Sequence, residues 1–316
     1  MGKLWIGISS CLLGEKVRWN GDHKQNLYAK EILGKFFDYV PVCPEVEIGM
    51  GVPRETVHLA GDKDSPRMVG TKTGTDWTQK MIRFSAGKVR ELSSHDLSGF
   101  IFKKGSPSCG IERVSLYTES GNKANSMAQG LFASTFMKKF PLIPVEEEGR
   151  LNDFKIRENF IVRVFSYHRL QKLFQEGYSR GALVNFHTQH KFLLLSHSRK
   201  HYDTLGGLVA EAKKFRPAEM KTRYSKIFME GLTLKSTPKK NTDVLQHMLG
   251  FLKKDLLKEE KQDILSTLED YRKELVPLIV PLTLIKHYVK KYDITYLLDQ
   301  VYLNPYPKEL MLRNHV

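Results

Sequence analysis

The sequence contains three cysteines, and each lies in a short polar turn instead of a long apolar run. Cys109 shows this most clearly, because the stretch KKGSPSCG surrounds it with Gly, Ser and Pro. A structural cysteine is usually packed in the core as a small hydrophobe. Cys11 in SSCLLG and Cys43 in VCPEVEIGMG have similar surroundings. The three thiols are therefore the first candidates for chemistry.

The spacing of the cysteines identifies no metal by itself. Intervals of 32 and 66 residues match neither a zinc knuckle nor a ferredoxin motif. All three cysteines lie beside Gly, Pro or Ser, where backbone amides can approach a sulfur-rich centre closely. On the residues alone, a shared metal centre and three unrelated cysteines are both open interpretations.

The elements that must position the cysteines alternate between strands and helices over residues 1–150. The predicted strands are 4–9, 39–43, 99–103 and 142–145, and the predicted helices are 24–37, 77–92 and 127–139, with a loop over 45–75. This alternation predicts an α/β domain with a parallel sheet covered by helices. Each cysteine then lies at or just beyond the carboxyl end of a strand, the edge where open α/β sheets build their sites.

From residue 151 onward the pattern predicts helices only. Apolar residues recur at three- and four-residue spacing over 154–174, 183–215, 244–257 and 264–279. Pro277 and Pro281 are expected to break or kink the helix around them, and residues 235–241 predict an exposed loop. The fold class predicted is an α/β parallel-sheet N-terminal domain, residues 1–150, with an all-α C-terminal domain, residues 151–316.

The composition is that of a globular protein with a basic second half. No apolar segment approaches the roughly 18 residues that span a membrane, and no processed leader is expected. The net charge is +15: residues 1–150 carry 21 Lys and Arg against 17 Asp and Glu, and residues 151–316 carry 29 against 18. Such a surplus favours polyanionic partners, although a basic protein without one has the same composition. Three cysteines argue against an exported disulfide framework, so we expect a cytoplasmic protein with no membrane partner.

Four motifs together resemble the thiouracil desulfidase family over roughly residues 3–147. They are SSCLLG followed by Arg18, CPEVEIGMGVPRE, KTGTDWT and KKGSPSCG. In that family three cysteines ligate a [4Fe–4S] cluster and leave one iron open. The resemblance implies that Cys11, Cys43 and Cys109 are these ligands. It also implies catalytic roles for Glu45 and Ser106.

The chemistry of desulfuration explains these residue types. An open iron is a soft Lewis acid, and a thiocarbonyl sulfur is a soft donor. Exchange of sulfur for oxygen also requires a general base near the cluster, and Glu45 is two residues from Cys43. The structural alternative for Glu45 is an ion pair with Arg54 or Lys16. Ser106 would orient the base or the ring, or pass a proton, unless it is only a turn hydroxyl.

Further candidate substrate contacts lie in both halves. Ser10, Ser108 and Arg18 belong to the first half, where the alternative role of the two serines is to shape their turns. In the second half, Lys191, Arg199 and Lys200 are candidates for binding a nucleic-acid backbone, with Tyr202 as a stacking surface.

Four histidines, His187, His190, His197 and His201, share a face if their segment is one continuous helix. They are open to three interpretations: a metal site, a set of hydrogen-bonded histidines between helices, or part of a surface that binds nucleic acid.

The second half resembles a helical family of formerly unknown function that is often fused behind the desulfidase domain. The matching motifs are FHTQHK, YDTLGGLVA and the segment from PLTLIKHYVKK to the end. Proteins of this architecture look like desulfidases of 4-thiouridine in tRNA, with the helical domain binding RNA. Lys286, Lys290 and Lys291 interleave with Tyr288 and Tyr292, which suits RNA or a solvated basic helix equally well.

The predicted function is a [4Fe–4S]-dependent, non-redox desulfidase that converts 4-thiouridine in tRNA, and free 4-thiouracil, with release of hydrogen sulfide. Two alternatives are open: an enzyme for free thiolated pyrimidine bases only, and an RNA-binding iron–sulfur redox sensor without turnover. The sequence predicts no oligomeric state.

Overall fold

The computed structural model describes residues 2–118 and 120–315, which form two compact units divided between Asp153 and Phe154. The first unit contains strands and helices, and the second contains helices and short turns. The predicted fold class is therefore confirmed. None of the described helices is both long and apolar enough to cross a membrane.

The first unit is built on a parallel four-stranded sheet in the order β2-β1-β5-β8. Its strands are β1 (Leu4–Ser9), β2 (Phe37–Val42), β5 (Leu97–Phe102) and β8 (Val145–Glu147). The two central strands are almost wholly buried, as their runs LWIGIS and LSGFIF predict. A Cβ at Gly7 would lie only 2.1 Å from the Phe100 ring. The glycine in β1 therefore leaves the space that the Phe100 side chain of the neighbouring strand β5 occupies.

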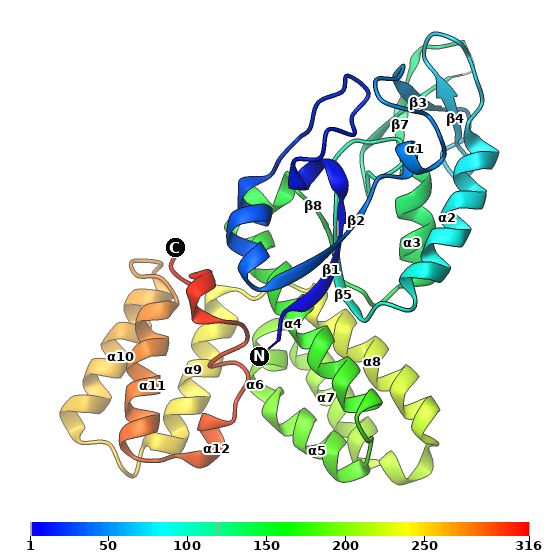
Figure 1. Ribbon diagram of the computed structural model, residues 1–316. Coiled ribbons are helices and arrows are strands. Elements are labelled where there is room, and N and C mark those ends of the chain that lie inside the picture. Colours follow the sequence, from blue (N-terminus) through cyan, green and yellow to red (C-terminus); the bar gives the residue numbers. More distant parts are fainter. Residues whose placement is uncertain (1, 119, 316) are drawn as a thin grey trace. The chain divides into compact units, whose positions relative to one another are not determined.

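Helices cover both faces of this sheet (Figure 1). The helices α2 (Thr78–Leu92) and α3 (Leu131–Lys139) lie side by side on one face, where Phe136 of α3 packs edge-on against Phe100. The opposite side carries a π-helical turn, Tyr28–Ile32, and a 3₁₀ turn, Leu33–Lys35. The predicted helix 24–37 is thus wrong over its first residues. Asn26 Oδ1 accepts from the amide of Ala29, so the helical turn begins later in the chain.

A second, mixed sheet in the order β4-β3-β6-β7 was not predicted. Its strands are β3 (Val57–Ala60), β4 (Arg67–Gly70), β6 (Val114–Tyr117) and β7 (Lys123–Ala128). The predicted loop 45–75 is wrong where it contains β3, β4 and a short helix, α1 (Pro44–Glu47). The predicted helix 127–139 is wrong over its first residues, because Met127 pairs with Ser115 in the sheet and α3 begins only at Leu131.

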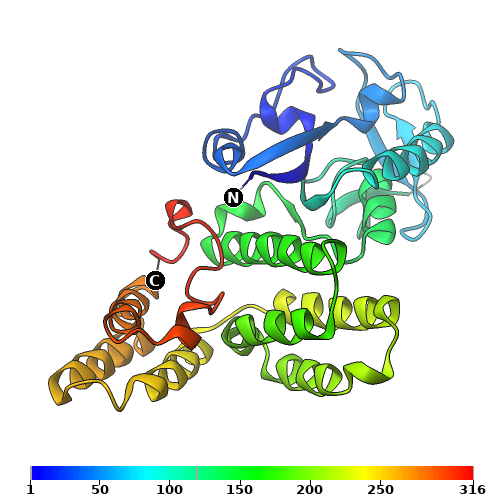
Figure 2. The same ribbon diagram turned by 60° about the horizontal axis from the view of Figure 1, so that its bottom comes forward.

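The second unit is a set of helices packed around aromatic side chains. The helices are α4 (Phe154–Gln175), α5 (Arg180–Gln189), α6 (Lys191–His197), α7 (Arg199–Ala210), α8 (Pro217–Thr233), α9 (Pro238–Leu252), α10 (Lys258–Arg272), α11 (Ile279–Lys291) and α12 (Thr295–Leu298). Within this unit α4 and α8 lie side by side, and α9, α10 and α11 form a second group (Figures 1 and 2). Phe228 and Tyr224 of α8 are fully buried and pack on Phe186 of α5.

Four predictions for the second half need correction. The predicted helix 244–257 begins earlier, at Pro238, and ends at Leu252 as α9. The predicted helix 183–215 is interrupted at His190 and at Ser198, whose extended backbone and hydroxyl cap α7. Residues 235–241 are only partly a loop, because α9 begins at Pro238. The predicted helix 264–279 ends at Arg272, before Pro277, while Pro281 lies in the first turn of α11, where proline is tolerated.

Candidate functional site

The three cysteines line one cavity of about 280 Å³ at the carboxyl edge of the parallel sheet. Cys11 lies in the 3₁₀ turn Ser10–Leu13 after β1, and Cys43 follows β2 and precedes α1, with Pro44 at the first helical position. Cys109 lies in the loop after β5. Parallel strands therefore bring together three thiols that are far apart in the chain, as the sequence predicts.

The Cys109 loop is fixed by α3. The amide of Leu131 donates to the carbonyl of Pro107, and the amides of Phe132 and Ala133 donate to that of Ser108. Gly130 is required at this contact, because its Cβ would lie only 2.6 Å from the backbone of Ser108. The first turn of α3 thus binds the carbonyls beside Cys109 and holds its thiol at the cavity.

Two glutamates at the end of β8 hold the same loop from its other side. Glu148 accepts from Lys103 Nζ at 2.7 Å and from the amide of Lys104 at 2.6 Å. Glu147 accepts from the amide of Ile111 at 3.0 Å. The loop that carries Cys109 is therefore bound by a carboxylate near each of its ends.

The donor chemistry of the cavity fits a soft metal centre. All three cysteines are free, and the described lining contains no histidine. Burial, with a contribution from the neighbouring Cys43, raises the pKa of Cys11 to about 12. Burial also raises the pKa of Cys109 to about 12, although hydrogen bonds from Ser9 and Ser108 oppose this shift, and it raises the pKa of Cys43. Thiolate sulfur selects soft metals and iron–sulfur clusters. Among the described residues, no group of three His, Cys, Asp or Glu converges on one ion.

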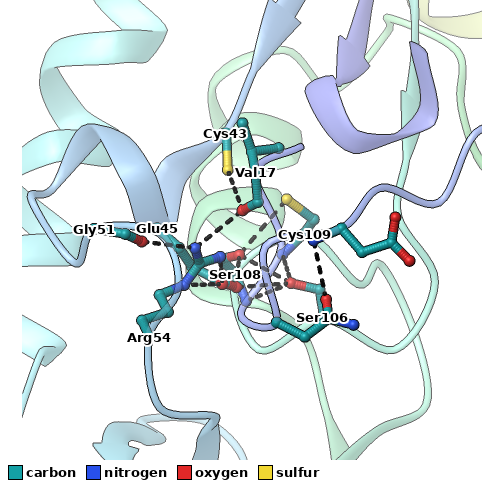
Figure 3. A network of polar contacts seen from close by, with 10 residues as sticks. Val17, Cys43, Glu45, Gly51, Arg54, Ser106, Ser108 and Cys109 are labelled. Atoms are coloured by element: carbon teal, nitrogen blue, oxygen red, sulfur yellow. Dashed lines mark hydrogen bonds and ion pairs between the residues drawn. The ribbon is translucent and has the colours of Figure 1, made fainter. Parts of the chain in front are cut away.

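Glu45 lies in the first turn of α1 and lines the cavity beside the cysteines (Figure 3). Its Oε2 accepts two hydrogen bonds from Arg54, from Nε at 3.1 Å and from Nη2 at 2.5 Å. Its Oε1 lies 2.9 Å from Ser108 Oγ and 3.3 Å from Ser106 Oγ. The ion pair with Arg54, the structural alternative for this residue, exists, and it lies within the candidate site.

The two serines form a short chain of hydroxyl groups between Glu45 and Cys109. The amides of Ser108 and Cys109 donate to Ser106 Oγ at 3.3 and 3.2 Å. Ser106 Oγ is 2.9 Å from Ser108 Oγ, which in turn is 3.6 Å from Cys109 Sγ. Each hydroxyl has one hydrogen, so it can turn between neighbouring acceptors. This arrangement suits proton transfer as well as turn formation.

The other predicted contacts of this unit also line the cavity. Ser10 is buried in the turn that carries Cys11, and Arg18 is half-buried at the cavity. Ser9, Trp19 and the Glu147–Glu148 pair were not predicted from the sequence as parts of the site. The signal for the last was three consecutive glutamates directly after the final predicted strand.

The basic candidates of the second unit lie at the starts of two helices. Lys191 begins α6, and its ammonium lies 5.4 Å from the centre of the Phe192 ring. Arg199 and Lys200 begin α7; Arg199 is 73% exposed and pairs weakly with Asp203, while Lys200 is exposed. Arg199 and Lys200 are thus accessible within their unit, Lys191 is half-buried, and contact of all three with RNA stays a prediction.

The four histidines lie at the ends of three helices and do not share one face. His187 Nδ1 is 3.2 Å from Tyr224 Oη, and His190 and His197 bond the carbonyls of Phe186 and Leu234 through Nδ1. Burial lowers the pKa of His187 and of His197 to about 4, and that of His190 to about 3. The structure therefore favours packing between helices. The ring of Tyr202, which was predicted to stack on bases, is itself stacked on the His187 ring with their centres 5.3 Å apart. One of its two faces is therefore covered.

The basic segment of α11 is largely engaged within its own unit. Tyr288 is buried, and Lys286 bonds Asn304 at 2.9 Å, with its pKa lowered to about 8 by burial. Lys291 and Tyr292 both bond Glu260. Of the five predicted residues only Lys290 is exposed without a partner within the described chain. This helix fits the alternative of a basic helix beside a core that contains tyrosine.

Comparison with known proteins gives matches for both units. The family model described as 2-thiouracil desulfurase matches residues 6–148, and one described as a protein of unknown function, DUF1722, matches residues 191–307. The uncharacterized protein YbgA of Escherichia coli K12 is 29% identical over 165 residues, 52% of this chain and 98% of the relative. The uncharacterized protein YbbK of Bacillus subtilis 168 is 32% identical over 156 residues, 47% of this chain and 98% of the relative.

A solved structure, that of the [4Fe-4S]-dependent thiouracil desulfidase TudS, is 26% identical and covers 48% of this chain and 94% of that one, with a TM-score of 0.39. The family match itself includes all three cysteines, Glu45, Ser106 and Ser108. The family match and the 32% identity to YbbK together show that the chain belongs to the 2-thiouracil desulfurase family. A DUF1722 domain follows the desulfurase domain.

Proposed function

We propose that this protein is a desulfidase that removes sulfur from 4-thiouridine in tRNA, and from free 4-thiouracil, and holds a [4Fe–4S] cluster on Cys11, Cys43 and Cys109. One observation carries the proposal: the three cysteines line the same cavity as Glu45, Ser106 and Ser108. Membership of the desulfurase family supports the reaction type, and three free thiols lining one cavity support an iron–sulfur cofactor.

The cysteines would hold the cluster as thiolates and leave one iron without a protein ligand. Burial keeps Cys11 and Cys109 protonated in the metal-free protein, so cluster assembly must displace their protons. When bound, the cluster would supply a soft Lewis acid that polarises the thiocarbonyl bond.

The side chains of the cavity supply the proton transfers. Glu45 Oε1 accepts a proton from the attacking water, while Arg54 holds Oε2 and fixes the carboxylate. Ser106 and Ser108 pass a proton to a ring nitrogen or to the leaving sulfur. Water thus provides the new carbonyl oxygen and two protons, and the sulfur leaves as hydrogen sulfide without oxidation or reduction.

The helical unit would bind the RNA part of the substrate. It carries most of the basic surplus, 29 Lys and Arg against 18 Asp and Glu in residues 151–316. Lys200 and Arg199 at the start of α7 are exposed and suit phosphate groups.

The function is tested by incubating the anaerobically reconstituted protein with thiolated tRNA and with free 4-thiouracil. We expect loss of thiocarbonyl absorbance and release of one sulfide per substrate in both reactions. Turnover of the free base alone would instead show an enzyme for free pyrimidines. A cluster and RNA binding without turnover of either substrate would show a redox sensor.

Two further measurements examine the cofactor and the RNA contact. Replacement of any one of the three cysteines by alanine is expected to remove most bound iron and sulfide, since two thiolates hold a four-iron cluster poorly. In the intact protein, rising salt should weaken tRNA binding with a logarithmic slope near −0.7 per phosphate contact for single strands and about −0.9 for duplex, while turnover of free 4-thiouracil changes little.

A further inference from the structure

An arginine and a tryptophan lie side by side in the chain at the cavity that contains the cysteines. Arg18 and Trp19 belong to the segment between the Cys11 turn and the π-helical turn, and both line the cavity. Trp19 is 46% exposed, which is unusual for so large an apolar ring. An exposed ring beside a reaction cavity offers a flat surface to part of a bound molecule.

Arg54 fixes this segment relative to Glu45. The backbone amide of Arg54 donates to the carbonyl of Trp19 at 2.8 Å, and its Nη1 donates to the carbonyl of Val17 at 2.9 Å. The remaining nitrogens of the same guanidinium bind Glu45 Oε2 (Figure 3). Arg18 and Trp19 are therefore held at a fixed position from the candidate general base, as contacts for a substrate must be.

Two cations of the cavity are free to bind a ligand. Among the residues that the structure describes, neither the Arg18 guanidinium nor the Lys104 ammonium forms a hydrogen bond or ion pair, and both residues line the cavity. The neighbouring Lys103, by contrast, is paired with Glu148. Unpaired cations beside an exposed aromatic ring are the combination that binds single-stranded nucleic acid, through phosphate contacts and base stacking.

We propose that Arg18, Trp19 and Lys104 form a subsite for the nucleotide next to 4-thiouridine in an RNA chain. Trp19 stacks on the base of that neighbour, and Arg18 and Lys104 bind the linking phosphates. The inference rests on the proposed function and adds a condition on the substrate. A base that stacks on Trp19 has left its own helical stack, so the RNA must be single-stranded around the thiouridine when it reacts.

A series of substrates tests the subsite: 4-thiouracil, 4-thiouridine monophosphate, and a trinucleotide with 4-thiouridine between two uridines. Only the trinucleotide has a neighbouring base. Trp19→Ala in the iron-loaded protein should raise the KM for the trinucleotide about 5- to 150-fold more than the KM for the monophosphate, the range that one stacked base provides. Trp19→Phe, which keeps an aromatic face, should recover most of this loss.

Matched variants separate the subsite from general effects of substitution. Trp5→Ala removes a ring that is 44% exposed and lies in β1, outside the cavity lining, so it should change no KM. Arg18→Gln should reduce the salt dependence of trinucleotide binding by about 0.7 in logarithmic slope. Lys139→Gln, which removes an exposed charge at the end of α3, should not.

Equal KM changes for the monophosphate and the trinucleotide in Trp19→Ala would overturn the proposal, because Trp19 would then contact the thiolated nucleotide itself. A binding measurement remains informative if no thiolated substrate reacts, a result that would refute the proposed function. Calorimetric titration with unmodified triuridylate and with uridine monophosphate should show that Trp19→Ala weakens binding of triuridylate selectively. Equal binding of triuridylate by wild type and Trp19→Ala would exclude the subsite.

Discussion

Arg54 places two guanidinium nitrogens on one carboxylate oxygen of Glu45 and leaves the second oxygen to serine hydroxyls. The two oxygens of Glu45 therefore have different surroundings. Oε2 is fixed by an ion pair whose partners are largely buried, and Oε1 meets groups that can exchange protons. An ordinary surface ion pair would bind the carboxylate without creating this difference.

Glu45→Gln is expected to keep the iron content of the reconstituted protein and to lower turnover of 4-thiouracil about 10²- to 10⁴-fold. The amide has nearly the same shape and its oxygen can still accept from Arg54, but it cannot accept a proton from water. Glu91→Gln, an exposed carboxylate of α2 outside the cavity, serves as the control. Turnover of Glu45→Gln within a few-fold of wild type would mean that water is activated by another group.

Arg54→Ala is expected to lower the free energy of unfolding of the first unit by about 3–5 kcal/mol, because the mostly buried Glu45 charge loses its partner. All three tryptophans lie in this unit, so urea denaturation of the metal-free protein can be followed by their fluorescence. Adding Glu45→Gln should restore part of the loss.

The control for Arg54 is Lys3→Ala, which breaks an exposed ion pair with Asp38 and should cost about 1 kcal/mol or less. If Arg54→Ala lowers the free energy of unfolding by no more than Lys3→Ala does, the Glu45 charge is solvated well enough to need no partner.

The parallel sheet and the cysteine positions could be predicted because strong local signals mark them. β1 and β5 are continuous apolar runs, and each cysteine lies at the end of a predicted strand or in the loop that follows it. The second sheet has no such signal, because β3 and β4 are four residues long and contain polar side chains. Their pairing depends on neighbours far along the chain.

Local pattern also could not predict the breaks between helices or the contacts of the site. The apolar spacing continues through His190 and Ser198. The start of a new helix at Ser198 is visible only in the structure, where its backbone is extended and its hydroxyl accepts a capping hydrogen bond from the amide of His201. The sequence allows Arg54 to be predicted as an ion-pair partner of Glu45. The hydrogen bonds from Arg54 to the carbonyls of Val17 and Trp19 depend on tertiary structure and could not be predicted.

Glu148→Gln is expected to loosen the loop that carries Cys109. The neutral amide weakens the charge-assisted bond to Lys103 Nζ and can accept at only one position, so it cannot serve both Lys103 and the amide of Lys104. In the metal-free protein we expect faster alkylation of Cys109, measured by mass spectrometry, and lower iron content after reconstitution. Glu112→Gln, an exposed carboxylate near the same loop, should alter neither property. An unchanged alkylation rate in Glu148→Gln would show that α3 alone fixes the loop.

The buried histidines predict that the helical unit loses stability in acid. Burial lowers the pKa of His187 and His197 to about 4 and that of His190 to about 3, whereas in the unfolded chain each has its ordinary value near 6.5. Below pH 6.5 the unfolded state therefore binds protons that the folded state does not. As the pH is lowered below 6.5, the free energy of unfolding therefore decreases, by up to about 1.4 kcal/mol per pH unit for each histidine, until the pKa of the folded state is reached.

Hydrogen exchange of the amides of α5 and α6 between pH 7 and pH 4.5 measures this loss within the helical unit. His197→Gln can still donate to the carbonyl of Leu234 but cannot be protonated, so it should remove about one third of the pH dependence. His247→Gln, at an exposed position of α9, should leave the dependence as it is in wild type. If His197→Gln loses protection in acid as steeply as wild type, the acid sensitivity arises from other groups and His197 does not act as a buried neutral residue.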